Sequence, residues 1–430
     1  MPGSSATGRS ELRKDGPLGP LAEREFRLLF SGQLVSLLGT AVAPIALAFA
    51  VLDLTGSKTD LGLVLTANWV PQLLLVLFGG VFADRLPRHL VMVGSNLLSG
   101  VAQGAIAVLL LTHHAELWHL IVLQVVRGIA MAFFFPAVQG LIPETVGPGL
   151  LQQANALLGM TKNGTNIFGA ALGGVLVATA GPGWALGFDG ATYLASAAIL
   201  AGMRLKRAER LEAPSVWREL AEGWSEFASR TWLWAVVASA AVGNTVWMGA
   251  SMVLGPLVAK QYLGGAASWG VIMASQGAGL LAGGLLLLRF HPKRLLLVGM
   301  GAFSVAALPL FFLASVRSTP VIAAGYFVAG VSLEIFSITW AMAMQQNVPR
   351  AKLSRVSAYD ALGSIVFVPL GLSLAGPVAD AIGLTEALWL AALLGTASTL
   401  AALAVRDVRD LRRRVDEEVP VVEPAWEAVP

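Results

Sequence analysis

Long runs of apolar residues without a charged side chain recur along the whole of this chain. Leu61 to Ala83 and Leu295 to Val316 are two of them. A hydrocarbon core about 30 Å thick requires helices of about 20 such residues, which the core helices of soluble proteins seldom sustain. Only 13% of the 430 residues are charged, against about 25% in soluble proteins. The sequence therefore predicts a polytopic helical membrane protein.

We predict an all-α fold of twelve transmembrane helices in two pseudo-symmetric six-helix bundles. Twelve helices of about 20 residues would use about 240 residues, which leaves short loops, a central linker and two tails. The spans are expected near 26–52, 61–83, 90–112, 118–142, 152–179, 184–203, 231–258, 267–288, 295–316, 320–346, 355–379 and 385–405.

Basic residues indicate the orientation of these spans. Nearly all of the 29 Lys and Arg residues fall on the side that holds both chain ends, while Lys58, Lys260 and Arg317 fall on the other side. Positive charge in short loops stays in the cytoplasm, so both termini are expected there. Arg outnumbers Lys, and Ala and Gly abound. We therefore expect a multi-pass protein in the inner cell membrane of a bacterium with a GC-rich genome.

The longest polar interval between spans separates six spans from six. We expect five parts in the chain: a disordered cytoplasmic N-terminus at 1–22, an N-terminal six-helix bundle at 23–203, a cytoplasmic linker at 204–230, a C-terminal six-helix bundle at 231–405 and a cytoplasmic tail at 406–430.

The two halves repeat a pattern of residues in the same order. Gly79 and Gly80 are matched by the pair Gly283-Gly284, and Pro143 is matched by Pro349. Copies with the same membrane orientation need an even number of spans each, and they leave a cavity on the axis between them. This arrangement is typical of transport by alternating access.

One loop carries a family resemblance. The segment Gly79-Gly80-Val81-Phe82-Ala83-Asp84-Arg85-Leu86-Pro87-Arg88-His89 resembles the loop signature of the major facilitator superfamily, and the resemblance covers residues 22–405. The stretches 53–57, 68–72 and 350–364 resemble the branch that includes enterobactin exporters and macrolide efflux proteins. The resemblance implies a secondary transporter with a gating loop formed by Gly79, Gly80, Asp84, Arg85 and Arg88.

The resemblance also implies that span 2 packs on span 11 at this loop. Small residues at Gly79 and Gly80 would let the two backbones approach closely. Asp84 would lie at the positive end of the span-11 helix and stabilise the state closed to the cytoplasm. For Arg88, a purely structural role at a span end is an equal alternative. The segment 169–174 resembles an exporter signature that has lost its proline, and we expect its glycines to serve close helix packing.

Five charged side chains lie more than one helical turn from the ends of the predicted spans, where each costs a few kcal/mol and is a functional candidate. The proton-coupling candidates are Glu334, Asp189 and Asp360, with Glu334 leading; a rise of about 1.5 Å per residue puts Glu334 and Asp360 at one level. The basic candidates are Arg127 and Lys162. Arg127 occupies the repeat position of Glu334, so the two charges are expected to face each other across the cavity. The alternative for each residue is a structural role, as an ion pair or as a side chain that snorkels to the membrane surface, and we favour this alternative for Asp360.

Polar and aromatic residues inside the spans are candidates for lining a substrate cavity. They are Asn68, Trp69, Gln72, Asn163, Asn166, Asn244, Trp247, Trp340 and Gln345. A mostly apolar cavity with few polar groups suits amphipathic or hydrophobic compounds better than sugars.

The sequence offers no catalytic, cofactor or metal site. His113, His114, Glu116 and His119 have metal-like spacing but no supporting ligands. A phosphate-binding loop is missing from the sequence, which argues against ATP use, and a soluble basic face for nucleic acid is missing as well. With 0 Cys, thiolate sites are excluded.

We therefore expect a monomeric secondary active transporter and not an enzyme. Its partners would be the lipid bilayer, protons and a small-molecule substrate, and it would export a drug, siderophore or metabolite in exchange for protons. Two alternatives stay open: a facilitator or importer of the same fold, and a membrane sensor that does not transport.

The orientation is directly testable. Reporter tags placed at the start and at the finish of the polypeptide should both report the cytoplasm, because the basic residues gather on that side. Tag accessibility in intact and permeabilised cells measures this. Ends on different faces of the bilayer, or an odd number of crossings, would contradict the predicted topology.

Overall fold

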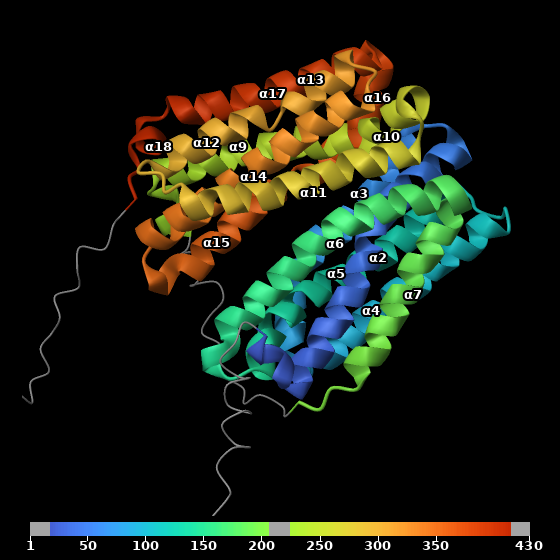
Figure 1. Ribbon diagram of the computed structural model, residues 1–430, viewed down its shortest axis with the longest axis horizontal. Coiled ribbons are helices and arrows are strands. Elements are labelled where there is room, and N and C mark those ends of the chain that lie inside the picture. The colour runs from blue at the N-terminus through green and yellow to red at the C-terminus, as the bar shows by residue number, and fades with distance from the viewer. Residues whose placement is uncertain (1–17, 206–223, 414–430) are drawn as a thin grey trace, which may run out of the picture.

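The computed structural model describes residues 18–205 and 224–413, without the side chains of residues 76–85, 350, 351 and 354. The described residues are almost entirely helical, and their helices form two bundles (Figure 1). The all-α polytopic fold predicted from the sequence is confirmed. Residues 206–223 of the predicted linker lie outside the described residues, so the predicted division at 204–230 stays a prediction.

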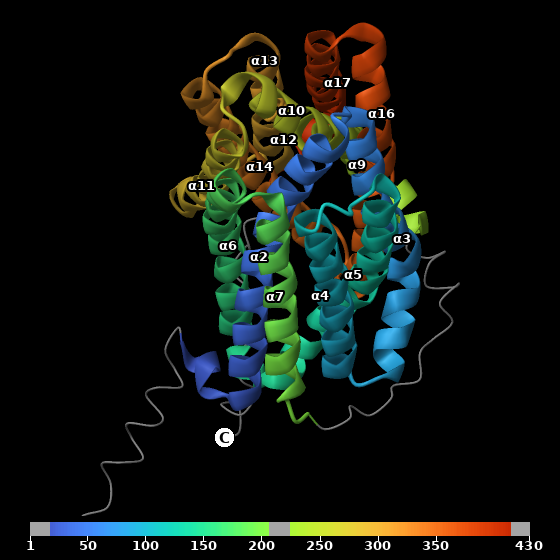
Figure 2. The same ribbon diagram turned by 90° about the vertical axis from the view of Figure 1, so that its right-hand side faces the viewer.

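The first bundle contains six long helices. They are α2 (Arg24–Thr55), α3 (Lys58–Arg85), α4 (Arg88–Leu111), α5 (Leu117–Thr145), α6 (Leu151–Ala180) and α7 (Pro182–Ala201). Short turns η1 (Gly19–Ala22) and η2 (Pro148–Leu150) precede α2 and α6. Gly56 ends α2 in the left-handed conformation, at φ +70°, which a residue with a side chain rarely adopts. Figure 2 shows α6, α2, α7 and α4 side by side.

The second bundle also makes six helical passes, but three of them are interrupted. Its elements are α9 (Thr231–Met248), η3 (Gly249–Leu254), α10 (Gly255–Val258), η4 (Ala259–Leu263), α11 (Ala266–Arg289), α12 (Leu295–Val305), α13 (Leu308–Ser315), α14 (Thr319–Asn347), α15 (Arg350–Ile365), α16 (Val368–Ile382) and α17 (Leu384–Ala404), followed by the short α18 (Arg406–Asp410). Pro309 and Pro369 open α13 and α16, because proline has no N–H for the preceding turn.

The predicted spans and the observed passes agree one for one over the described residues. Nine of these passes are both long and apolar enough to cross a membrane by length and composition. Most observed helices extend a few residues beyond the predicted ends, because a helix continues into the interfacial region where charged residues are tolerated. The interruptions in the second bundle were not predicted, since apolar composition does not report on local backbone breaks.

The two ends of the molecule differ in how the bundles meet. Both described chain ends lie on one face, which we call the basic face because Arg24, Arg294 and Arg406 lie there; we call the other the opposite face. Figure 1 shows α3, α10 and α16 together at the opposite face, whereas α15 and the nearer ends of the first bundle lie apart at the basic face.

Glycines bring the two bundles into backbone contact toward the opposite face. A Cβ on Gly174 of α6 would lie 2.8 Å from Gly270 Cα of α11, and a Cβ on Gly62 of α3 would lie 2.3 Å from the carbonyl oxygen of Leu372 of α16. Any side chain at these positions would push the bundles apart. The expectation that the glycines of 169–174 serve close packing is confirmed, because Gly173 packs in the same way on Val42 of α2.

Span 2 therefore meets span 11, but at the end away from the gating loop. The side chains of Gly79, Gly80, Asp84 and Arg85 are not described, so their predicted gating contact stays a prediction. Arg88 donates hydrogen bonds to the carbonyl oxygen of Gly140 at 2.6 Å and to Glu144 at 2.9 Å, a tie between α4 and α5 that fits the structural alternative.

Two ion pairs join the bundles at the opposite face. Lys260 Nζ lies 2.5 Å from Asp53 Oδ1 and also donates to the carbonyl oxygen of Leu52, and Lys58 Nζ lies 2.5 Å from Asp380 Oδ1. Asp53 and Lys260 are 207 residues apart, the same offset that relates Arg127 to Glu334. Equivalent ends of the two repeats therefore carry opposite charges and bind each other.

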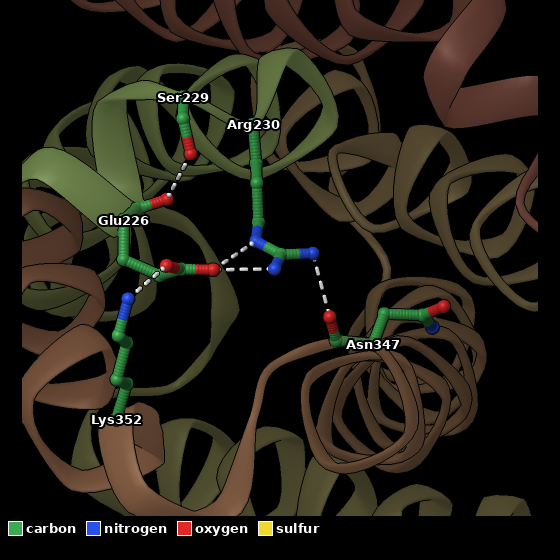
Figure 3. A network of polar contacts seen from close by, with 5 residues as sticks. All are labelled: Glu226, Ser229, Arg230, Asn347 and Lys352. Carbon is green, nitrogen blue, oxygen red and sulfur yellow. Dashed lines mark hydrogen bonds and ion pairs between the residues drawn. The ribbon is translucent and has the colours of Figure 1, made fainter.

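At the basic face, the residues just before α9 are tied to α14 and α15. Glu226 accepts hydrogen bonds from Lys352, at 2.8 Å, and from Arg230, which also donates to the carbonyl oxygen of Asn347 at 2.6 Å (Figure 3). The hydrogen bonds from Lys352 and then Arg230 lower the pKa of Glu226 below its ordinary value. This network fixes the start of the second bundle to the end of α14 and the first turn of α15.

Aromatic packing supports the same attachment. The rings of Trp224 and Phe227 lie 5.4 and 6.0 Å from the ring of Tyr359 in α15, and Phe227 is buried. After α18, the chain pairs with the turn before α12: Leu295 N donates to Leu411 O at 3.2 Å and Arg413 N to Lys293 O at 2.9 Å. At the basic face, the residues before α9 and the residues after α18 thus both pack against other helices or turns of the second bundle.

The ion pair between equivalent repeat positions can be tested by charge exchange. Asp53→Lys or Lys260→Asp places like charges together and should favour opening at the opposite face, by up to about fivefold because an exposed pair contributes at most about 1 kcal/mol. The double exchange should restore closure. The readout is the labelling rate of Thr66→Cys by a membrane-impermeant maleimide in this cysteine-free chain. If the double variant labels as fast as the single variants, the pair does not hold this face closed.

Candidate functional site

The second bundle contains an acidic pocket with a volume of about 420 Å³. Four residues predicted from the sequence line it: Glu334 and Trp340 of α14, Asp360 of α15 and Asn244 of α9. The expectation that the two acids share a level of the membrane agrees with this placement. Most of the remaining lining is apolar, so the pocket holds two carboxyl groups against a hydrophobic wall. We call it the acidic pocket.

Hydrogen bonds hold Asp360 in place. Trp340 Nε1 donates to Asp360 Oδ2 at 3.0 Å, and Ser364 Oγ donates to Asp360 Oδ1 at 3.4 Å. Asn244 Nδ2 in turn donates to the carbonyl oxygen of Ser364 at 2.9 Å. The carboxylate of Asp360 is therefore oriented by two side chains, and the helices α9, α14 and α15 are connected through it.

Glu334 differs from Asp360 because no side chain that the structure describes is hydrogen-bonded to it. Among the described residues, the Glu334 carboxylate takes part in no hydrogen bond or ion pair. Gly283 and Gly284 of α11 leave the space for its side chain: a Cβ on Gly283 would lie 2.9 Å from Glu334 Cβ, and one on Gly284 would lie 3.9 Å from Glu334 Oε1. The glycine pair noted as a repeat match thus makes room for the half-buried acid, whose carboxylate can take up a proton or a cation.

Stacked aromatic rings form one wall of the acidic pocket. The ring of Phe303 in α12 lies 4.6 Å from that of Phe336, which lies 6.3 Å from that of Trp340, and both pairs are stacked. Trp232 meets Trp340 edge to face at 5.6 Å. Aromatic faces attract cations through their quadrupole, and more strongly when water is excluded. Together with the carboxyl groups, this wall suits a ligand that is both apolar and positively charged.

The first bundle buries a polar cluster around Asp189, which is 0% exposed. Gln103 Nε2 of α4 donates to Asp189 Oδ2 at 2.6 Å, and Gln124 Nε2 of α5 reaches Gln103 Oε1 at 3.5 Å. Asn68 of α3 donates to the carbonyl oxygen of Gln124 at 3.3 Å. Of this cluster, sequence reasoning named Asp189 and Asn68 and missed both glutamines.

Arg127 belongs to the same bundle. Arg127 donates to the hydroxyl of Tyr193 at 3.3 Å, and this hydroxyl lies 2.9 Å from Thr40 Oγ1. Arg127 and Asp189 attract each other electrostatically. The structure does not bring Arg127 into contact with Glu334, so the predicted charge pair across the cavity is not found among the described contacts. The opposite charge with which Arg127 interacts is instead Asp189 of its own bundle.

A periodic signal in the sequence could have revealed this cluster. Asn96 and Gln103 are seven residues apart on α4, and Asp189 and Ser196 are seven apart on α7. A spacing of two helical turns puts each pair on one face. Asn96 Nδ2 indeed donates to Ser196 Oγ at 2.9 Å. Polar residues at this spacing within apolar spans predict a shared buried seam.

The other candidates lie outside both the acidic pocket and the polar cluster around Asp189. Lys162 and Asn166 are exposed on α6, with Asn163 half-buried between them. Gln345 is exposed near the end of α14, and Gln72 is half-buried on α3. The two remaining tryptophans belong to the apolar core: Trp69 packs against it, and Trp247 does so with its ring 5.5 Å from that of Tyr326.

The buried cluster of the first bundle makes a stability prediction. Asp189→Asn removes the negative charge near buried Arg127 and should lower the free energy of unfolding by roughly 2 kcal/mol or more. The double variant Asp189→Asn with Arg127→Gln should be less destabilised than the single one, because no uncompensated charge remains. Thermal unfolding in detergent measures both, with Asp407→Asn at an exposed position of α18 as the control. A double variant less stable than the single would show that the two charges do not compensate each other.

Comparisons with known proteins place this architecture in a family. The sequence matches the model of the Major Facilitator Superfamily over residues 29–365. It is 28% identical over 383 residues to the multidrug efflux pump Tap of Mycolicibacterium fortuitum, covering 85% of this chain and 90% of that protein. It is 24% identical over 396 residues to macrolide efflux protein A of Streptococcus pyogenes, covering 90% and 97%.

Solved structures share the fold. An auto-inhibited peptide transporter of the POT family superposes with a TM-score of 0.68 at 14% identity, covering 92% of this chain and 99% of that one. The nucleoside transporter NupG superposes with a TM-score of 0.64 at 13% identity, covering 88% and 98%. The chain belongs to the major facilitator superfamily and is a multi-pass membrane transporter of small molecules rather than an enzyme.

Proposed function

We propose that this transporter exports small amphipathic compounds, cationic ones in particular, in exchange for protons. The observation that carries the proposal is the acidic pocket, in which Glu334 and Asp360 lie beside the stacked rings of Phe303, Phe336 and Trp340. A carboxylate attracts the positive end of such a compound, and the rings pack against its apolar part. The names of the relatives, a multidrug efflux pump and a macrolide efflux protein, support export.

The exchange follows from the electrostatics of a membrane pocket. An uncompensated negative charge inside a membrane protein is costly, so Glu334 favours a partner that supplies a positive charge. A proton and the cationic end of a substrate both satisfy this need, and they compete for one carboxylate. Release of one when the other binds couples their movements. Asp360, already held by Trp340 and Ser364, positions the substrate and shapes the pocket.

Alternating access supplies the movement. The glycine contacts and ion pairs join the bundles at the opposite face. If the basic face is cytoplasmic, as the distribution of Lys and Arg predicts, this state is open toward the cytoplasm and loads substrate for export. The closed cytoplasmic state would use the gating loop at residues 79–88. We further propose that a monomer carries out the cycle, because the acidic pocket is lined entirely by one bundle of one chain.

Glu334 is the residue whose replacement tests the coupling. In proteoliposomes loaded with ethidium, an imposed pH gradient should drive ethidium transport by the unaltered protein. Glu334→Gln should reduce the rate of pH-driven ethidium transport at least about tenfold, because the amide cannot exchange a proton. Glu334→Asp should retain part of it. Asp360→Asn serves as a matched control that should weaken ethidium binding and leave the dependence on pH.

The same assay separates the alternatives. Unchanged pH-driven transport in Glu334→Gln would remove Glu334 from the coupling role. Ethidium flux that ignores the imposed gradient in the unaltered protein would indicate a facilitator, and no flux in either direction would favour a sensor.

A further inference from the structure

A small apolar cavity lies directly behind the acidic pocket, within the core of the second bundle. Its volume is about 40 Å³, and its lining includes Gly243, Val246, Ala306, Ala307, Leu310 and Gly395. We call it the apolar chamber. Asn244 and Thr399 are polar members of its lining, and Thr399 donates its hydroxyl to the carbonyl oxygen of Gly395 at 3.0 Å. The chamber therefore offers a ligand almost only hydrocarbon contacts.

The acidic pocket and the apolar chamber share a wall. Asn244, Phe303 and Leu333 line both cavities. Asn244 is fixed by its hydrogen bond to the carbonyl oxygen of Ser364, and Leu333 is a compact side chain on continuous helix. The ring of Phe303, 8% exposed, is the largest apolar group in this wall and the main barrier between the two spaces.

The ring of Phe303 lies between another aromatic ring and a glycine. On one side it stacks on Phe336 at 4.6 Å. On the other side it faces Gly243, where even a Cβ would lie 3.3 Å from Phe303 Cζ. Phe303 also lies in the last turn of α12, and its carbonyl oxygen accepts a hydrogen bond from Ala306 N at 3.0 Å as the helix breaks. A glycine therefore borders the ring in α9, and a larger residue at that position would restrict the ring.

We propose that Phe303 determines the size of the apolar group that a transported cation can carry. The positive end of the substrate lies at Glu334 and Asp360, and its apolar end passes Phe303 and enters the apolar chamber. This inference rests on the proposed function, since it requires that the acidic pocket binds substrate. It extends that function to a substrate class: compounds with one cationic head and one flexible apolar tail whose length the chamber limits.

A series of n-alkyltrimethylammonium ions with chains from butyl to dodecyl tests the proposal. Each ion, below its micelle concentration, competes with ethidium transport in proteoliposomes. For the unaltered protein, affinity should rise with chain length until the tail fills the space that Phe303 allows. Phe303→Ala joins the two cavities and should move this limit to longer chains. Each additional methylene that becomes buried should increase apparent affinity roughly fourfold.

Three further variants keep the result interpretable. Phe303→Leu should shift the limit in the same direction by less. Gly243→Ala should restrict the ring and move the limit to shorter chains. Leu280→Ala is the matched control: it removes an apolar side chain from the lining of the acidic pocket, but Leu280 does not line the chamber. It should weaken all chain lengths by a similar factor.

The outcomes separate this inference from the proposed function. If the unaltered protein transports ethidium and binds the ions, but the Phe303 and Gly243 variants keep its chain-length profile, the inference is wrong and the proposed function stands. If the unaltered protein neither transports ethidium nor binds any ion of the series, both are wrong. Should Phe303→Ala fail to reach the membrane, the other two variants test the inference: Phe303→Leu should move the chain-length limit to longer chains and Gly243→Ala to shorter ones.

Discussion

Close backbone contact between the two bundles is the constraint on which the rest of this structure depends. In lipid, helices gain no hydrophobic free energy by associating, so packing between small residues must hold them together. Gly174 against Gly270 and Gly62 against Leu372 bring the bundles to contact distance on one side only. Contact on one side separates the bundles on the other, which is what a carrier needs in order to expose a site to one face at a time.

The two bundles share a fold and differ in their chemistry. In the first, the charges of Asp189 and Arg127 are buried together with amide and hydroxyl partners, which favours a rigid body. In the second, Glu334 lines an open pocket without such partners among the described residues. Although the backbone arrangement is repeated, the polar cluster makes the first bundle rigid, whereas the second bundle carries the pocket that can bind a ligand. The broken helix α12–α13 lies beside that pocket and belongs to the same division of roles.

The predictions that depended on composition agree with the structure. The order of the spans and their all-α character follow from runs such as Leu61 to Ala83, because a bilayer admits hardly any other sequence. The family was indicated separately, by the resemblance of the loop at residues 79–89. The depth estimate for Glu334 and Asp360 also agrees with their shared pocket, since depth depends only on the rise of a helix. By contrast, Arg127 and Glu334 are not in contact, although they hold the same repeat position. Position along a helix does not fix which way its side chains face.

The sequence by itself determined the number and order of the helices and the membrane environment, because lipid penalises every unsatisfied polar group regardless of tertiary structure. It also pointed to the buried acids, which composition makes conspicuous. Only the tertiary structure decided which of them meet. The pairing of Asp189 with Gln103, the wall of rings beside Asp360 and the chamber behind Phe303 depend on helix rotation and on glycine contacts between distant segments. Those are set by the packing of all helices together, which no local stretch of sequence specifies.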